Sequence, residues 1–304
     1  MKTAQILVHL GAPADFSIGA ADAFLREFLS DAAVLAMPSF IRKPLSRRIA
    51  KKRAGVYLEN LKKTSINGLV RTQVLMNSLA KKVSEITSCD TYVASRYGVG
   101  NIPETITKLR LDGIKNFKFL PMYPQYANCT VGTIKKEVFA NRKSGENFLF
   151  CDSYYDNPIY IANLAKLLNG YGGKVLASFH SIPIKQDKDK KYSTQCLRTI
   201  ELLADATGLK NIEIVWQSKM GKCVKWLEPS AENRVVELAN AGVKKLGVIC
   251  AGFPLDCTET LIEIDTDLRS VFFEAGGDEF SYFQCLNDTR EQAEIISDVF
   301  ERLR

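Results

Sequence analysis

Short apolar runs alternate with longer segments of helical periodicity along the whole chain. The apolar runs have the length of buried strands, and they lie near residues 4–10, 91–95, 116–121, 147–151, 174–179, 212–216, 245–250 and 280–285. Helical patterns fill the intervals. In the segment 232–241, Val235, Leu238 and Ala239 recur at helical spacing, and Gly242 follows as a left-handed stop signal. The alternation predicts an α/β fold with mostly parallel sheets.

Three short motifs occur twice, in the same order in each half of the chain. Each copy follows or ends a predicted strand, and the pairs are VHLGAP and SFHSIP, SRYG and SKMG, GIKNFKFLPMYP and GVKKLGVICAGFP. This repetition predicts two related, Rossmann-like doubly wound halves, residues 1–155 and 156–304, with the functional site in a cleft between them. The final helix, from about Asp288, is a candidate to pack back on the first half.

Composition narrows the class of protein. A chain of 304 residues with 46% hydrophobic residues is long enough for two sub-domains. Its eight cysteines are scattered without a CxxC pair, which favours reduced thiols over disulfides, a zinc site or an iron–sulfur cluster. Neither a long apolar span nor a leader pattern is recognisable, so a cytoplasmic location is expected.

The net charge of +7 is concentrated locally. Seven basic residues lie within twelve positions: Arg42, Lys43, Arg47, Arg48, Lys51, Lys52 and Arg53. The apolar run 32–40 precedes them, so this segment could rest on an anionic membrane surface. On sequence alone, an ordinary solvated helix face is the favoured interpretation. Base-stacking motifs and phosphate loops are not recognisable, so no nucleic-acid partner is expected.

His180 and an acidic series supply the candidate chemistry. His180 ends the predicted strand KVLASF, where ligand-facing residues of open α/β sheets lie. Near neutral pH an imidazole can accept a proton or bind a transition metal, although a structural histidine is an equal alternative. Glu259, Glu263 and Asp267 follow another strand at i, i+4 and i+8 of a helix expected to start near Asp256. They would form one stripe, advancing about 40° per step, although a solvated face is the commoner explanation.

Together, one imidazole and several carboxylates suit a hydrated divalent ion that is held loosely and passed on. Aromatic residues lie near the same strand ends: Tyr123 and Tyr126 in the first half, Trp216 and Trp226 in the second. Flat rings suit a flat ligand, although ordinary core or interface packing is the favoured explanation of the two tryptophans.

At these residues the sequence resembles the ferrochelatase family, nearest to its Gram-negative and mitochondrial pattern. The resemblance runs almost end to end and rests on LGAP, FLSD, RYG, YPQY with TVGT, SFHSIP, WQSKMGKCVKWLEP and GFPLDCTETLIEI. It implies a chelatase-like fold and a lyase of haem biosynthesis that inserts Fe²⁺ into protoporphyrin IX. Iron and porphyrin would then be substrates, with no tightly bound cofactor.

The family's functional residues carry over by position. The resemblance implies that His180 and Glu259 are catalytic and metal-binding, and that Glu263 and Asp267 continue the acidic metal track. Porphyrin contacts would come from Arg96, Tyr97, Tyr126, Trp226 and Phe253. The segment 32–53 corresponds to the family's pocket lip, which adds weight to contact with the inner face of the membrane.

One departure keeps alternatives open. Where the family commonly has GGSP-L beside the porphyrin, this chain has Thr64, Ser65, Ile66, Asn67 and Gly68. A non-catalytic or repurposed paralogue that binds tetrapyrrole or haem is therefore a second hypothesis, and a chelatase for coproporphyrin III or another metal is a third.

Overall fold

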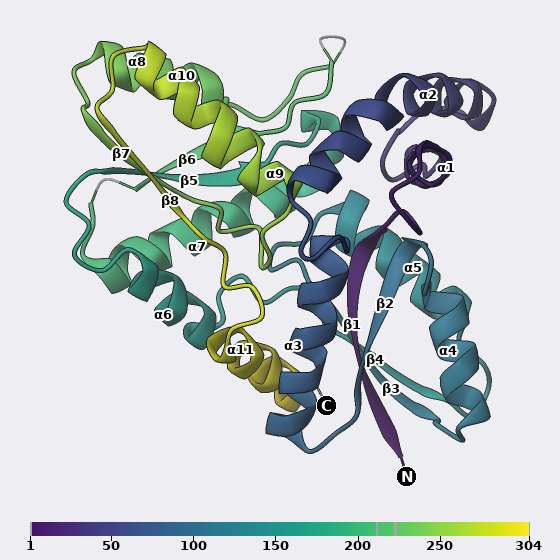
Figure 1. The fold of residues 1–304 in the computed structure, drawn as a ribbon. Coiled ribbons are helices and arrows are strands. Elements are labelled where there is room, and N and C mark those ends of the chain that lie inside the picture. The colour runs from purple at the N-terminus through teal and green to yellow at the C-terminus, as the bar shows by residue number, and fades with distance from the viewer. Residues whose placement is uncertain (1, 211, 222–223, 304) are drawn as a thin grey trace. The chain divides into compact units, whose positions relative to one another are not determined.

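The computed structural model describes residues 2–210, 212–221 and 224–303 (Figure 1). The chain forms two compact units, one of residues 1–153 and 288–304 and the other of residues 154–287. The chain thus leaves unit 1 two residues before the boundary expected after residue 155, and its last segment belongs to unit 1.

Unit 1 is built on a parallel sheet with the strand order β2-β1-β3-β4. Its strands are β1 (Thr3–Ala12), β2 (Thr91–Gly98), β3 (Asn116–Pro121) and β4 (Asn147–Phe150). Its helices are α1 (Ile18–Leu29), α2 (Ser39–Lys63), α3 (Arg71–Thr87), α4 (Ile102–Leu111), η1 (Asn128–Gly132), α5 (Thr133–Ala140) and α11 (Arg290–Arg302). Figure 1 shows α3 and α11 on one face of this sheet and α4 and α5 on the other.

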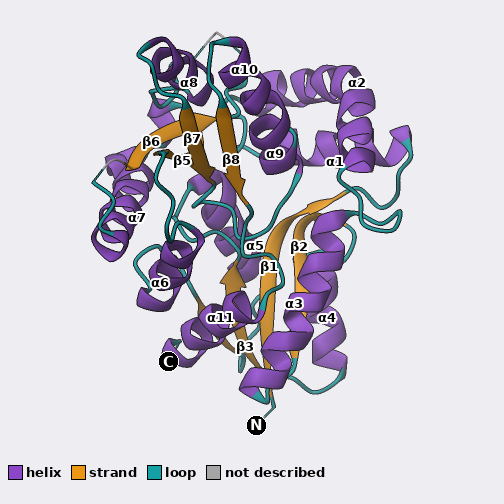
Figure 2. Cartoon of the chain, turned by 60° about the vertical axis from the view of Figure 1, so that its left-hand side comes forward, coloured by secondary structure: helices purple, strands orange, loops and turns teal. Residues whose placement is uncertain are grey.

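Unit 2 repeats the arrangement with the order β6-β5-β7-β8. Its strands are β5 (Lys174–His180), β6 (Ile212–Gln217), β7 (Lys245–Ile249) and β8 (Glu279–Phe283). Its helices are α6 (Pro158–Leu167), η2 (Ile184–Gln186), η3 (Lys188–Lys190), α7 (Lys191–Thr207), α8 (Ala231–Asn240), α9 (Thr258–Leu261), η4 (Glu263–Leu268) and α10 (Arg269–Glu274). Figure 2 shows helices flanking the strands of each unit. The matching strand orders confirm the two doubly wound halves that the repeated motifs predict.

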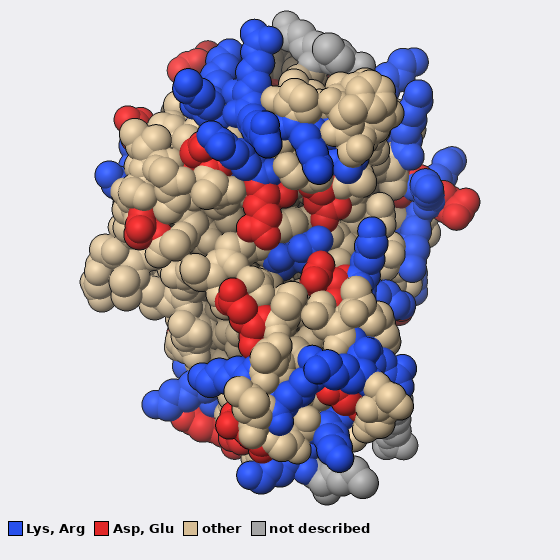
Figure 3. Space-filling model, turned by 90° about the vertical axis from the view of Figure 1, so that its right-hand side faces the viewer, with Lys and Arg blue, Asp and Glu red and all other residues tan. Residues whose placement is uncertain are grey.

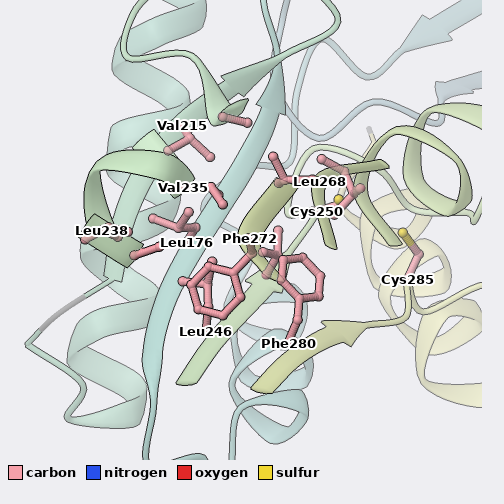
Figure 4. Packing of buried hydrophobic residues seen from close by; sticks show 14 residues of the cluster. Leu176, Val215, Val235, Leu238, Leu246, Cys250, Leu268, Phe272, Phe280 and Cys285 are labelled. Atoms are coloured by element: carbon pink, nitrogen blue, oxygen red, sulfur yellow. The ribbon is translucent and has the colours of Figure 1, made fainter. Parts of the chain in front are cut away.

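The core of unit 2 lies between one face of its sheet and the helices α8 and α10. Leu176, Leu246 and Phe280 project from three strands toward Leu238 of α8 and Phe272 of α10 (Figure 4). Each buried side chain of this size stabilises the fold by about 1.5–3 kcal/mol relative to an exposed one. This packing makes the sheet a rigid support for the side chains at its carboxyl edge.

Local sequence signals set the helix boundaries. The side chain of Asn101 accepts a hydrogen bond from the N–H of Glu104, and the Glu104 carboxylate accepts one from the N–H of Asn101, so a capping box starts α4. The Ser230 hydroxyl caps α8 by accepting from the N–H of Asn233, and Gly242 follows that helix with a φ of +90°. The helix predicted over 232–241 and its left-handed stop are therefore confirmed.

The acidic segment after β7 corrects one prediction. A single regular helix from about Asp256 is wrong, because the short α9 gives way to a π-helix, η4, before α10. The Asp267 N–H bonds to the carbonyl of Ile262, five residues back, at 2.8 Å. This wider turn removes the regular 40° step expected of the carboxylates. Another π-helix, η1, precedes α5 in unit 1, and such turns are frequent at functional sites.

Seven cysteines lie in the described part of the chain, and all seven are free thiols. Cys223 lies outside the described residues. Burial raises the pKa of the described thiols Cys129 and Cys151 to about 11, so they stay protonated and unreactive near neutral pH.

Candidate active site

His180 stands at the carboxyl end of β5 with its ring held in one orientation. Its Nδ1 lies 2.7 Å from the carbonyl oxygen of Ser181. A carbonyl only accepts, so Nδ1 carries a proton, and in the neutral form of the ring Nε2 is the nitrogen that has the lone pair. The Tyr192 hydroxyl of α7 donates to the His180 carbonyl at 2.9 Å and fixes the backbone. A neutral imidazole with a free Nε2 can accept a proton or bind a metal ion.

Glu259 lies in the first turn of α9. The Thr258 hydroxyl donates to its Oε2 at 2.7 Å. The preceding turn is anchored by Asp256, which is only 2% exposed and accepts hydrogen bonds from the Tyr282 hydroxyl (2.5 Å) and the Asn287 amide (2.7 Å). Because these bonds hold the start of α9, Glu259 has a defined backbone position.

Glu263, the first residue of η4, has an unusual acidity. Burial raises its pKa to about 7, and the negative charges of Glu259 and Glu232 add to this effect. Hydrogen bonds from Ser218 and Gln217 oppose the rise without cancelling it. A carboxyl group with a pKa near the working pH exchanges protons readily, as a general acid–base group must. Ser218 meets it from a left-handed backbone conformation, with a φ of +63°, which is uncommon for a residue other than glycine.

The remaining acidic residues of η4 differ in surroundings. Asp267 is exposed, whereas Asp265 is partly buried and paired with Arg269. Among the described residues, no group of three or more His, Cys, Asp and Glu side chains is arranged to hold a metal ion. The carboxylates Glu259, Glu263 and Asp267 thus differ in their surroundings and are not gathered into one group.

In unit 1 the predicted contacts Arg96 and Tyr97 form a network around Asp31. The Asp31 Oδ2 accepts from Arg96 Nη2 (3.0 Å), the Tyr97 hydroxyl (2.9 Å) and the Thr133 hydroxyl (2.6 Å). Arg96 also donates from Nε to Thr133 at 2.9 Å and lies over the Tyr97 ring. Tyr97 is only 1% exposed. The structure thus brings these two residues together, with their polar groups directed at Asp31.

The pKa of Asp31 is lowered. Burial opposes ionisation, but hydrogen bonds from Thr133, the Ala33 N–H and Tyr97, with the charge of Arg96, outweigh it. The Asp31 carboxylate is therefore ionised at neutral pH and joins the segment after α1 to the end of β2 and the start of α5.

Three other predicted contacts lie at turns. Trp226 pairs through its backbone with Pro183, three residues after His180, and its indole N–H donates to the carbonyl of Gly221 at 3.1 Å. Phe253 packs on the core of unit 2. Tyr126 precedes η1, and its hydroxyl lies beside Gly132. In unit 2, His180, Glu259, Glu263 and Trp226 all lie on segments that follow the carboxyl ends of β5, β6 and β7.

The segment that departs from the family pattern forms a tight turn between α2 and α3. Ile66 and Leu69 exchange backbone hydrogen bonds of 3.0 and 2.9 Å, and Asn67 and Gly68 have φ values of +50° and +73°. Asn-Gly is the sequence preferred where both central residues are left-handed. The segment therefore forms a well-defined two-residue turn.

Sequence reasoning missed Asp31, Ser218 and Gln217, which connect the predicted residues. Gln217 ends β6 and Ser218 begins the SKMG motif that follows, so the strand end and the repeated motif were a signal that could have identified both residues. Asp31 lies in an irregular segment, and the FLSD motif that contains it gave no hint of its partners.

Comparison with known proteins agrees with the motifs. The ferrochelatase family model matches residues 2–303. A ferrochelatase of Aliivibrio fischeri is 32% identical over 98% of this chain and 96% of its own. A ferrochelatase of Bordetella pertussis is also 32% identical, over 99% of this chain and 88% of its own.

Solved structures share the fold at low sequence identity. SirB from Bacillus subtilis, solved with Fe³⁺, aligns with a TM-score of 0.57 and 11% identity over 98% of this chain and 94% of its own. CbiX, described as the terminal enzyme for siroheme biosynthesis in denitrifying bacteria, aligns with a TM-score of 0.51 and 11% identity over 99% of this chain and 98% of its own. With its fold and its full-length relatives established, the chain belongs to the ferrochelatase family, a family of metal chelatases, which are lyases.

Proposed function

We propose that this protein inserts Fe²⁺ into protoporphyrin IX and so forms haem. The observation that carries the proposal is His180, whose Nδ1 is committed to the carbonyl of Ser181 while Nε2 stays available. The relatives named ferrochelatase supply the substrate class. Insertion releases two pyrrole protons for each Fe²⁺ that enters, so the site must accept protons as well as admit the ion.

The described residues suit both tasks. His180 Nε2 accepts one pyrrole proton, and Glu259 with Glu263 accepts the other and passes it toward Asp267. Glu263 fits this step because its pKa is about 7, so it takes up and releases protons near neutral pH. The same carboxylates would guide hydrated Fe²⁺ inward, since oxygen ligands release it more easily than thiolates do. Iron passes through as a substrate, and we expect neither a tightly bound cofactor nor an iron–sulfur cluster.

We propose substrate contacts for the remaining predicted residues. Tyr126, Trp226 and Phe253 offer aromatic surface to the macrocycle. Arg96, with Tyr97 behind it, offers a guanidinium suited to a carboxylate substituent of the porphyrin. Arg96 is already paired with Asp31, so it would act as a preorganised donor rather than a mobile one.

The test measures anaerobic Fe²⁺ insertion into protoporphyrin IX and into coproporphyrin III, with the absorbance of the porphyrin as the readout. We expect wild-type protein to insert iron into protoporphyrin IX faster than into coproporphyrin III. Faster turnover of coproporphyrin III would change the substrate while keeping the reaction. Tight porphyrin or haem binding without insertion would instead identify the non-catalytic paralogue and overturn the proposal.

We also propose that α2 rests on an anionic membrane surface at the cytoplasmic face. Its apolar residues Phe40, Ile41 and Val56 are 76%, 47% and 63% exposed. Six of the seven clustered basic residues are exposed, whereas Arg42 donates from Nε to the carbonyl of Ser30 at 2.8 Å. Figure 3 shows Lys and Arg side chains gathered near the top of the side that carries α1 and α2. None of the described helices is long and apolar enough to cross a bilayer.

Vesicle sedimentation tests this contact. Wild-type protein should bind vesicles with anionic lipid and release them at high salt, because polybasic contacts are screened. The variant Arg48→Glu/Lys52→Glu should lose most of the binding. The variant Lys185→Glu/Lys188→Glu, which makes the same change of charge outside α2, is the matched control. Equal binding by both variants would contradict the role of α2.

A further inference from the structure

Gln217, the last residue of β6, is a buried amide that contacts the elements carrying both predicted catalytic residues. It is 1% exposed, and it is the register partner of His180 in the parallel pair β5–β6. Paired residues of adjacent strands project on the same face of a sheet, and so does Ser178, two residues before His180. Ser178, His180 and Gln217 therefore share one face at the carboxyl edge of the sheet.

Both ends of the Gln217 amide are committed. Its Oε1 accepts from the Ser178 hydroxyl at 2.6 Å, and the Cys250 thiol lies 3.8 Å away. Its Nε2 donates to the main-chain carbonyl of Glu259 at 2.8 Å. That carbonyl is only an acceptor, so the orientation of the amide is determined. The side chain thus ties β5 to the first turn of α9.

The backbone of Gln217 makes a further contact on the His180 side. Its carbonyl accepts from the N–H of Ser181 at 2.8 Å, and the Ser181 carbonyl is the group that orients the His180 ring. The next residue in the chain, Ser218, donates to the Glu263 carboxylate. One residue therefore lies in direct contact with the supports of His180 and Glu259 and next to that of Glu263.

We propose that Gln217 is a positioning residue that fixes Glu259 relative to His180 through its side-chain amide, an inference that rests on the proposed function. It does not touch the reacting atoms. Its amide instead links the ends of β5 and β6 to the short helix α9 through two hydrogen bonds. Because α9 has only four residues before the π-helix, internal helical hydrogen bonds alone cannot hold Glu259 in place.

Gln217→Met keeps the volume of the side chain and removes both hydrogen bonds. Misplacing a catalytic group by about 1 Å costs about a hundredfold in rate, so kcat for insertion should fall about tenfold to a hundredfold. The KM for porphyrin should stay within about twofold, because the substrate contacts are untouched. Gln195→Met replaces another buried glutamine of unit 2, in α7, and should leave kcat within about twofold of wild type.

A double-mutant cycle distinguishes a specific effect of Gln217 on the position of Glu259 from a general loss of structural stability. If Gln217 acts through Glu259, then Gln217→Met should lower kcat by less than about twofold in a Glu259→Gln background, because the positioned carboxylate is already gone. Losses that multiply independently would overturn the proposal. Should Gln217→Met fail to fold, Ser178→Ala decides the question, because it removes only the donor to Oε1 and should lower kcat about threefold in the same coupled way.

A spectroscopic measurement keeps this test apart from that of the proposed function. The chain has two histidines, so ¹³C-labelled imidazoles give two resonances, one from His180 and one from His9 in unit 1. Gln217→Met should shift the His180 resonance and leave that of His9 in place, with or without enzymatic activity. Two unshifted resonances with wild-type kcat would overturn the positioning role, whereas absent insertion by wild-type protein would overturn only the proposed function.

Discussion

Each unit has a carboxyl group that faces the end of its second strand, and the pKa values of these two groups are shifted in opposite directions. In unit 1, Asp31 faces the end of β2, where Arg96 and Tyr97 donate to it, and its pKa is lowered. In unit 2, Glu263 faces the end of β6, where Ser218 donates to it, and its pKa rises to about 7. No ion pair to Glu263 occurs among the described residues. A duplicated fold thus carries a fixed anchor in one half and a proton-exchanging group in the other.

The motifs after the second strand of each unit explain this difference. SRYG in unit 1 provides a guanidinium and a phenol, whereas SKMG in unit 2 provides neither, and Lys219 is paired with Glu228 instead. The π-helices differ likewise: η1 contains no acidic residue, and η4 contains three. Chemistry is therefore expected from unit 2, and scaffolding with substrate contact from unit 1.

His180→Ala gives the largest expected effect. Removing the only oriented imidazole of unit 2 should lower insertion about a thousandfold or more while porphyrin binding stays within about threefold. The control is Arg96→Gln in unit 1, which should instead weaken porphyrin binding more than kcat. Insertion kinetics and porphyrin fluorescence titration check both values, and an unchanged rate for His180→Ala would place the chemistry elsewhere.

Asp31→Asn should destabilise the protein by about 1–3 kcal/mol, because it removes a carboxylate that accepts three hydrogen bonds and leaves the partly buried Arg96 with only the more distant Glu137, at 3.5 Å, as an acidic partner. The free energy of unfolding in urea measures this loss. Asp152→Asn breaks the more exposed pair with Lys135 and should cost about 0–1 kcal/mol. Equal losses for the two variants would show that the Asp31 network is no stronger than a surface ion pair.

Glu263→Gln should increase the free energy of unfolding, whereas Asp31→Asn lowers it, and the size of the increase should depend on pH. The folded-state pKa of Glu263 lies above its ordinary value of 4.5. The stability contributed by this group is therefore fully present below pH 4.5 and is lost as the pH rises through about 7. At pH 8, Glu263→Gln should be more stable than wild type by about 2–3 kcal/mol, and the gain should shrink toward pH 5.

Urea unfolding at pH 5 and pH 8 checks this sign. The exposed Glu274 of α10 provides the control, because Glu274→Gln should give the same small difference at both pH values. A gain for Glu263→Gln that is independent of pH would contradict the raised pKa.

The smallest expected effect is a change in stability at Gln292, a buried glutamine that differs from Gln217 in its hydrogen bonds. Gln217 in unit 2 uses both ends of its amide, whereas neither amide atom of Gln292, in α11 of unit 1, has a hydrogen-bond partner among the described residues. Gln292→Met should therefore stabilise the protein by about 1 kcal/mol, since it removes an unsatisfied buried polar group. Thermal unfolding measures it, and a lower melting temperature would reveal a partner for this amide.

Strand positions were accessible to sequence reasoning because buried parallel strands are continuous apolar runs. The position of His180 followed from the same pattern, since it ends such a run. The π-helices could not be predicted, because an acidic series at i, i+4 and i+8 has the same appearance in an α-helix. Asp31 and Gln217 acquire their roles from partners distant in the sequence, such as Thr133 and Ser178, and no local pattern encodes those contacts.

The return of the last helix to unit 1 affects how the protein is made on the ribosome. Residues of β1 to β4 emerge before unit 2, whereas α11 emerges after it. This helix packs on α3, and its Phe300 carbonyl accepts from Lys118 at 2.8 Å. At about 5–20 residues per second, synthesis from the end of β4 to the end of α11 takes roughly 8–30 s, and the nascent first unit lacks its last helix for that time. Unit 2 is continuous in sequence and can close during that time. Unit 1 therefore starts to form before unit 2 but is completed after it. Until α11 is made, the surface of α3 that it covers is accessible to chaperones.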